Sequence, residues 1–166
     1  IARMKIPPFI ATLGMMLILK GLSLVISGTK PIYFNDTPSF PLISTGSFIG
    51  DLIPASPVPN RVIVLFVLAL LISWILNRTT LGRYCFALGS NEEAVRLSGV
   101  NADGWKVTIY ALAGGICGIA GLLIASRLNS AQPALGQGYE LDAIAAVVIG
   151  GTSLAGGRGS ILGTII

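Results

Sequence analysis

The sequence predicts an all-α fold, a polytopic transmembrane helical bundle that is a fragment of a larger membrane protein. Of its 166 residues, 53% are hydrophobic and 11% are charged, whereas ordinary soluble domains carry about 25% charged residues. The 21 glycines favour closely packed helices, because small residues let helix backbones approach each other in lipid. Since the chain opens on Ile1 and stops within an apolar run, we interpret residues 1–166 as one partial transmembrane domain of a longer polypeptide.

The first two spans follow from length and composition. A helix rises about 1.5 Å per residue and the hydrocarbon core is about 30 Å thick, so a span needs roughly 20 residues. Residues 8–28 meet this requirement with one charged interruption, Lys20, and Pro7 and Pro8 suit a first helical turn. Residues 59–77 form the second predicted span, although its apolar centre needs flanking residues to cross the membrane.

Three further segments follow. Residues 107–126 carry small residues four positions apart, a spacing that predicts a span packed inside the bundle. Residues 140–155 are shorter in their apolar part and form either a short interior helix or a re-entrant one. A fifth segment, 160–166, begins after a glycine-rich turn and is cut off by the end of the chain.

Lys and Arg predict the orientation, because cytoplasmic segments carry an excess of both. With a cytoplasmic N-terminus, seven of these residues fall in inner segments, three fall in outer segments and one lies within the membrane. This arrangement places residues 29–58 outside, as a loop stiffened by prolines, and residues 78–106 in the cytoplasm.

A short helix is predicted within the cytoplasmic loop. Ser90 and Glu93 match a capping box, in which two side chains satisfy the backbone amides at a helix start, and Gly99 suits the left-handed position after a helix end. So short a helix is marginal alone in water and needs something to pack against. Ala94 and Leu97 share a face that suits a groove on another protein. Alternatively, the helix is solvated and lies on the membrane surface.

Four stretches of sequence point to one family. They are Thr80-Leu-Gly-Arg-Tyr-Cys-Phe-Ala-Leu-Gly-Ser-Asn-Glu-Glu-Ala-Val-Arg-Leu-Ser-Gly-Val-Asn101, Ala131-Gln-Pro133, Gly136-Gln-Gly-Tyr-Glu-Leu-Asp-Ala-Ile-Ala-Ala-Val-Val-Ile-Gly-Gly-Thr-Ser153 and Gly156-Gly-Arg-Gly-Ser-Ile-Leu-Gly-Thr164. With these motifs, the chain closely resembles the permease subunits of bacterial ribose-type ABC sugar importers. The resemblance covers essentially the whole chain and is densest from Gly82 onward.

The resemblance implies a multi-pass permease subunit in the bacterial inner membrane, with residues 29–58 in the periplasm. It implies a homodimer that receives ribose or a related sugar from a periplasmic binding protein and binds a cytoplasmic ATPase subunit. The ATPase would bind ATP and Mg²⁺, because this chain has no G-x-x-x-x-G-K-[ST] phosphate loop. We expect no cofactor, metal site, enzymatic activity or nucleic-acid partner in this chain. By the same resemblance, the ATPase-coupling helix comprises Ser90, Asn91, Glu92, Glu93, Ala94, Val95, Arg96, Leu97, Ser98 and Gly99.

A second group of residues is predicted to line a translocation path: Lys20, Gln137, Tyr139, Glu140 and Asp142. A cationic side chain in mid-membrane costs about 2.5 to 3.5 kcal/mol on insertion scales, so Lys20 should face the bundle interior. There it either donates hydrogen bonds to sugar hydroxyls or has a structural role. Glu140 and Asp142 either line the mouth of the path or stabilise the amides of a first helical turn.

A third group forms either a hinge or a set of packing positions: Gly150, Gly151, Thr152, Gly156, Gly157 and Gly159. Packing is favoured, because small residues are common where membrane helices touch.

Two other functions compete with the importer subunit. An ion-coupled transporter without an ATPase would need carboxylates near the membrane midplane, whereas the acidic residues here lie at segment ends or in loops. A membrane scaffold protein is the other alternative.

Overall fold

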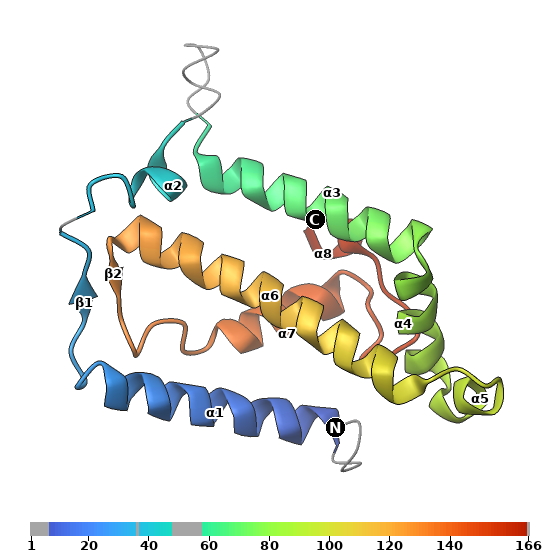
Figure 1. The fold of residues 1–166 in the computed structure, drawn as a ribbon. Coiled ribbons are helices and arrows are strands. Elements are labelled where there is room, and N and C mark those ends of the chain that lie inside the picture. The colour runs from blue at the N-terminus through green and yellow to red at the C-terminus, as the bar shows by residue number, and fades with distance from the viewer. Residues whose placement is uncertain (1–6, 36, 48–57, 166) are drawn as a thin grey trace. The chain divides into compact units, whose positions relative to one another are not determined.

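The structure, a computed structural model, describes residues 7–35, 37–47 and 58–165. Within these ranges helices predominate, and the one sheet has two short strands (Figure 1). Three of the described helices are long and apolar enough to cross a membrane: α1 (Pro8–Ile26), α3 (Asn60–Arg78) and α6 (Ala102–Leu128). The predicted all-α membrane fold is therefore confirmed. Residues 36 and 48–57 of the predicted outer loop, and Ile166, lie outside the described residues.

Local signals set the ends of these helices. Pro8 occupies the first turn of α1, and the helix ends shortly before Gly28, whose φ of 58° is left-handed. α6 begins at Ala102, whereas the sequence predicts a start at residue 107. The reason is a cap, since the Asn101 side chain accepts a hydrogen bond from the Gly104 amide at 3.0 Å.

The chain divides into two compact units, and α3 and α6 each contribute to both. Besides the start of α3 and the end of α6, the first unit contains α1, β1 (Ile32–Tyr33), α2 (Leu42–Thr45) and β2 (Ser130–Ala131). The second unit contains the remaining parts of α3 and α6 with α4 (Thr80–Ser90), α5 (Glu92–Leu97), α7 (Tyr139–Ile149) and α8 (Ile161–Ile165).

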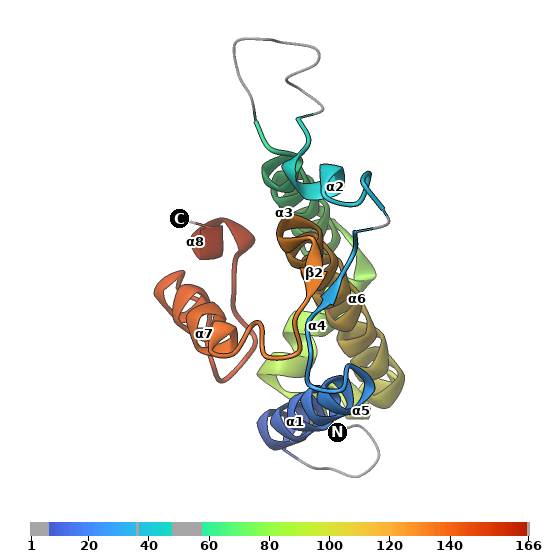
Figure 2. The same cartoon turned by 90° about the vertical axis from the view of Figure 1, so that its left-hand side faces the viewer.

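In the first unit, the loop after α1 is attached to the end of α6. β1 pairs with β2 in antiparallel register, with Ile32 opposite Ala131 (Figure 2). Close by, the Ser126 hydroxyl donates to the Phe40 carbonyl at 2.7 Å and accepts from the Ser44 amide at 3.1 Å. Both serines are fully buried, so these bonds are shielded from water. The attachment places both segments at the same end of the unit, and that this end is the outer side stays a prediction.

In the second unit, α4 lies within the predicted cytoplasmic loop, where the sequence predicts only the short helix of residues 90–99. Its half-buried positions Leu81, Tyr84, Cys85 and Leu88 follow the three-and-four spacing of a helix face. Tyr84 stacks on Trp105 of α6, with ring centroids 4.7 Å apart. This periodicity is visible in the sequence, but the polar residues around it favour a loop.

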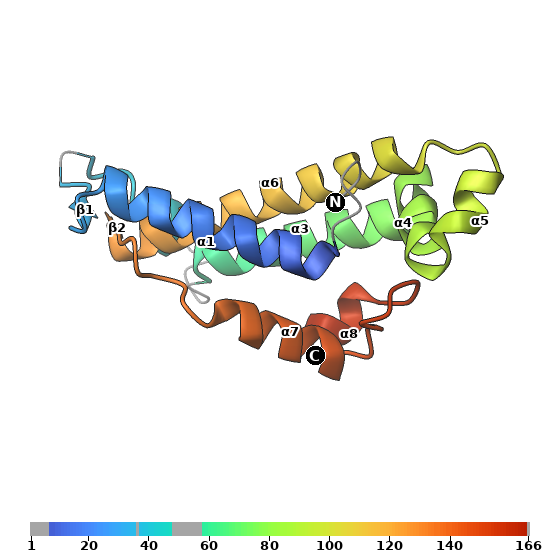
Figure 3. The same cartoon turned by 90° about the horizontal axis from the view of Figure 1, so that it is seen from below.

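α7 and α8 contact each other, and Figure 3 shows them side by side. α7 has 11 residues, which amounts to roughly 16 Å of helix and is too short to cross a membrane. It ends at Ile149 because Gly150 and Gly151 follow, and Gly151 has a left-handed φ of 80°. The predicted segment 140–155 is thus a shorter helix followed by a turn.

Candidate functional site

The short helix predicted within residues 90–99 is present as α5, but its N-cap is one residue later than the capping-box pattern predicts. Asn91 is the N-cap, and its side-chain oxygen accepts a hydrogen bond from the Ala94 amide at 3.0 Å. Ser90 is instead the last residue of α4, so the predicted capping box of Ser90 with Glu93 is wrong. Asn and Ser are equally good N-caps, and the continuation of α4 through Ser90 decides between them.

Replacing Asn91 with alanine should therefore destabilise α5 by about 1 kcal/mol, because the Ala94 amide loses its acceptor. We expect faster hydrogen exchange of the amides in residues 94–97 of the full-length protein in detergent. Ser90→Ala is the matched control and should leave this exchange unchanged. The reverse pattern, with only Ser90→Ala increasing exchange, would restore the capping box.

The end of α5 has the geometry that the sequence predicts. Gly99 has a φ of 81°, a left-handed conformation in which glycine is unstrained. Its amide donates to the Arg96 carbonyl at 3.1 Å, and the Ser98 amide donates to the Ala94 carbonyl at the same distance. α5 is consequently a closed unit of six residues between two defined ends.

Ion pairs join α5 to the start of α6. Glu92 accepts hydrogen bonds from Arg96 at 3.0 Å and from Lys106 at 2.6 Å, and Arg96 also pairs with Asp103. The hydrogen bond from Lys106, helped by that from Arg96, holds the pKa of Glu92 below its ordinary value against the effect of burial. Glu92 is therefore ionised at neutral pH. The sequence shows the Glu92–Arg96 spacing of four, but the pairs across to α6 depend on how the loop folds.

The apolar residues of α5 point in different directions. Val95 is 8% exposed and packs toward the rest of the unit, whereas Leu97 is 84% exposed and Ala94 is exposed beside it. An exposed leucine beside an exposed alanine on one short helix suits an apolar groove on another protein. α5 thus presents Ala94 and Leu97 outward while Val95 and the ion pairs fix it to its own chain.

Three predicted path residues, Tyr139, Glu140 and Asp142, lie together in the first turn of α7. The Glu140 carboxylate accepts a hydrogen bond from the Gly138 amide at 3.1 Å, an ordinary stabilising contact at a helix start. Gln137 lies in the turn just before them. Lys20 is half-buried on α1 in the other unit. A shared path for these residues stays a prediction.

Most glycines of the predicted hinge-or-packing group lie in close contacts, and the choice between the two roles stays a prediction. A Cβ on Gly150 would collide with the backbone of Gly163 in α8, and one on Gly159 would lie 2.9 Å from Thr152. Gly151 has open space around it and is needed for its left-handed φ. Gly156 and Gly157 pack against the end of α4, a contact that local sequence patterns do not predict.

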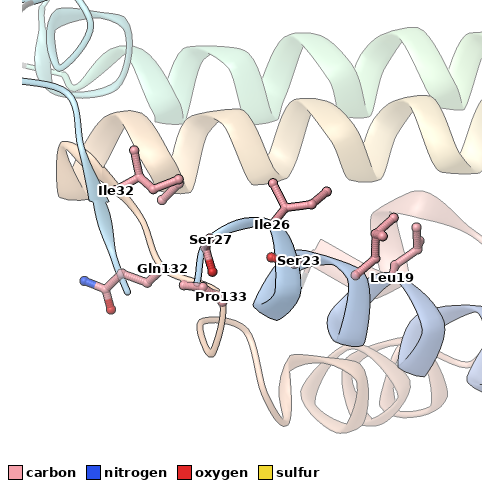
Figure 4. A pocket seen from close by; sticks show the side chains of 9 residues that line it. Leu19, Ser23, Ile26, Ser27, Ile32, Gln132 and Pro133 are labelled. Atoms are coloured by element: carbon pink, nitrogen blue, oxygen red, sulfur yellow. The ribbon is translucent and has the colours of Figure 1, made fainter. Parts of the chain in front are cut away.

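A groove of about 370 Å³ lies in the first unit, beside the end of α1. Figure 4 shows Leu19, Ser23, Ile26 and Ser27 of α1 and its following turn along one wall, with Ile32, Gln132 and Pro133 opposite. The lining is largely apolar, so the groove is unsuited to a charged ligand.

The permease family described as "Branched-chain amino acid transport system / permease component" matches residues 1–166. The chain belongs to this family. It is 44% identical over 169 residues to the ribose import permease of Escherichia coli K12, and 46% identical over 168 residues to that of Bacillus subtilis 168. It is 41% identical over 167 residues to the fructose import permease of Rhizobium meliloti.

These alignments cover 100%, 100% and 99% of this chain, but 50%, 50% and 46% of the relatives. The chain therefore spans about half the length of the relatives it matches. No solved structure matches it. The three spanning-length helices fit the multi-pass, inner-membrane location of this permease family.

Proposed function

We propose that this chain is part of the transmembrane subunit of an ATP-binding-cassette importer, through which ribose or a related monosaccharide crosses the inner membrane. In this proposal a periplasmic binding protein delivers the sugar and two copies of the permease form the path. A separate cytoplasmic ATPase binds ATP with Mg²⁺. The similarity to two ribose import permeases supports the sugar as cargo, whereas the family description names branched-chain amino acids.

The observation that carries the proposal is the construction of α5. It exposes Leu97 on a helix of six residues, and ion pairs fix the same helix to the start of the spanning helix α6. A partner seated on Leu97 can therefore pull on a spanning helix through Glu92, Arg96 and Lys106. This is the arrangement that a transporter driven by a separate ATPase needs, since alternating access requires helices to move as rigid bodies.

The importer mechanism is tested with the full-length permease, its ATPase and its binding protein in proteoliposomes. We expect uptake of radiolabelled ribose to require ATP in the compartment facing α5, and to stop when a non-hydrolysable analogue replaces ATP. Dissipating proton and sodium gradients is the matched control and should leave uptake unchanged. Uptake that follows an ion gradient and needs no ATP would establish the ion-coupled alternative.

A panel of monosaccharides and branched-chain amino acids in the same vesicles separates the two cargo classes. ATP-dependent uptake of leucine, and of none of the sugars, would overturn the assignment of a sugar as cargo.

A further inference from the structure

The end of α4 contacts the turn between α7 and α8 through backbone atoms, with no side chain between them. A Cβ on Gly89 would lie 2.6 Å from the amide nitrogen of Gly157 and 3.4 Å from the Cα of Gly156. From the other side, a Cβ on Gly156 would lie 2.6 Å from the Gly89 carbonyl oxygen. Figures 1 and 3 show the loop after α7 reaching the last turn of α4. We call Gly89, Gly156 and Gly157 the glycine contact.

Each side of the glycine contact is restricted to glycine for a reason of its own. On the α4 side, any Cβ meets backbone, which cannot rotate away as a side chain would. In the turn, Gly156 and Gly157 have φ values of 91° and 76°, which L-residues with side chains rarely adopt. The two backbones therefore lie closer than any other pair of residue types would allow.

The glycine contact lies next to the start of α5. Gly89 is separated from Asn91, the N-cap of α5, by Ser90 alone, and the Asn91 amide donates to the Ala87 carbonyl of α4 at 3.0 Å. Ser90 itself borders Gly157, where a Cβ would lie 3.1 Å from the Ser90 Cα. Only Ser90 and Asn91 lie between Gly89 and the first residue of α5, so a displacement of α5 also moves the glycine contact.

On its other side, the contact leads into α7 and α8. The turn is closed by a hydrogen bond from the Ser153 amide to the Arg158 carbonyl at 3.0 Å. α7 and α8 pack on each other where Gly150 meets Gly163. The turn and both helices are thus joined to one another and can shift together.

A cavity of about 370 Å³ adjoins the glycine contact and leaves room for such a shift. α4 contributes Cys85 and Phe86 to its wall, and the segment after α7 contributes Thr152, Ser153 and Ser160. Burial raises the pKa of the Cys85 thiol, in keeping with its place in this wall. The turn between α7 and α8 is therefore in tight contact with α4 at the glycines and has open space beside it.

We propose that Gly89, Gly156 and Gly157 are positioning residues of the transport cycle, whose backbone contact transmits movement of α5 to α7 and α8. The proposal rests on the function proposed above and adds a second route to it, besides the ion pairs to α6. Backbone pressed against backbone has no side-chain rotation to absorb a displacement, so a shift on one side appears on the other. The adjoining cavity gives the turn room to shift before it meets the side chains of the opposite wall.

The test uses the reconstituted full-length importer with Gly89→Ala. A methyl group at this position must displace the turn, so we expect the sugar taken up per ATP hydrolysed to fall roughly tenfold. Copurification of the ATPase and the basal rate of ATP hydrolysis should stay at wild-type values, because Leu97 and the ion pairs are untouched. Gly14→Ala is the matched control, since a Cβ there meets nothing within 4 Å. Unchanged uptake per ATP in Gly89→Ala would overturn the proposal.

A second measurement keeps the proposal testable if Gly89→Ala does not fold. In the wild-type importer, hydrogen exchange at Ser153 and Gly156 is compared between the nucleotide-free and the vanadate-trapped states. We expect at least a twofold change, because movement of α5 reaches this turn. Identical exchange in the two states would overturn the proposal, whereas a wild-type protein without ATP-driven uptake would overturn the proposed function itself.

Discussion

Replacing Leu97 with aspartate is expected to release the ATPase from the full-length permease. Leu97 is 84% exposed at the end of a six-residue helix, the most outward apolar side chain of α5. In a docked complex, an aspartate at this position would be buried without a counter-charge. Burying an unpaired charge costs much more free energy than losing one apolar contact at the rim of an interface. A central apolar anchor contributes about 2 kcal/mol or more, so we expect affinity to fall at least about thirtyfold.

The measurement is copurification of the ATPase with tagged permease, followed by a titration of the two in detergent. Asn101→Asp is the matched charge control. It adds the same negative charge near α5, and aspartate caps α6 as well as asparagine does. Ala94→Asp should act in the same direction as Leu97→Asp, because Ala94 is exposed beside it. If Leu97→Asp copurifies as well as the wild type, α5 lies on the membrane surface or in solvent and does not dock.

The spans could be predicted from the sequence because lipid imposes one simple requirement on them. A run of about 20 apolar residues with few charges has hardly any other stable arrangement, and α1, α3 and α6 each satisfy that condition. The ends were less certain, since they depend on single caps. α6 starts at Ala102 because of the Asn101 side chain, and hydropathy does not register a cap.

The candidate site was predictable in its location and less so in its construction. Gly99 indicates the end of α5, because glycine readily adopts the left-handed conformation found after a helix end. The start was ambiguous, because Ser90 and Asn91 are both good caps and the choice depends on where α4 ends. The ion pairs of Lys106 and Asp103 with α5 could not be predicted, because these residues meet α5 only after the loop has turned back.

Contacts between distant segments could not be predicted from one sequence. β1 and β2 have two residues each, and their pairing depends on the ends of α1 and α6 coming together. The glycine contact is similar, because glycine at 89 is equally compatible with a flexible loop. What decides its role is a neighbour nearly 70 positions away, Gly157. Such pairs follow from the packing of whole helices, for which local pattern carries no information.

Adding a methyl group at Gly82 is expected to destabilise the protein more than Asn91→Ala does. α3 ends at Arg78 and α4 begins at Thr80, so Thr79 alone makes the corner between them. Gly82 is buried on the inside of that corner, where a Cβ would lie 2.5 Å from both the carbonyl carbon and the Cα of Leu76. Because these atoms are backbone, the angle between α3 and α4 must open to admit the methyl group.

Overpacking of this kind typically costs 1 to 3 kcal/mol, and Gly82→Val should cost more than Gly82→Ala because the two methyl groups on its Cβ need still more space. The measurement is thermal unfolding of the full-length protein in detergent. Gly21→Ala is a sharp control, since a Cβ there meets nothing within 4 Å. Alanine is favoured over glycine within helices by roughly 1 kcal/mol, so Gly21→Ala should be neutral or stabilising while Gly82→Ala destabilises. Opposite signs for one chemical change at two helical positions can come only from the space around them. Equal melting temperatures for Gly82→Ala and the wild type would mean that the α3–α4 corner is wider than described, and α5 would then be held in a different place.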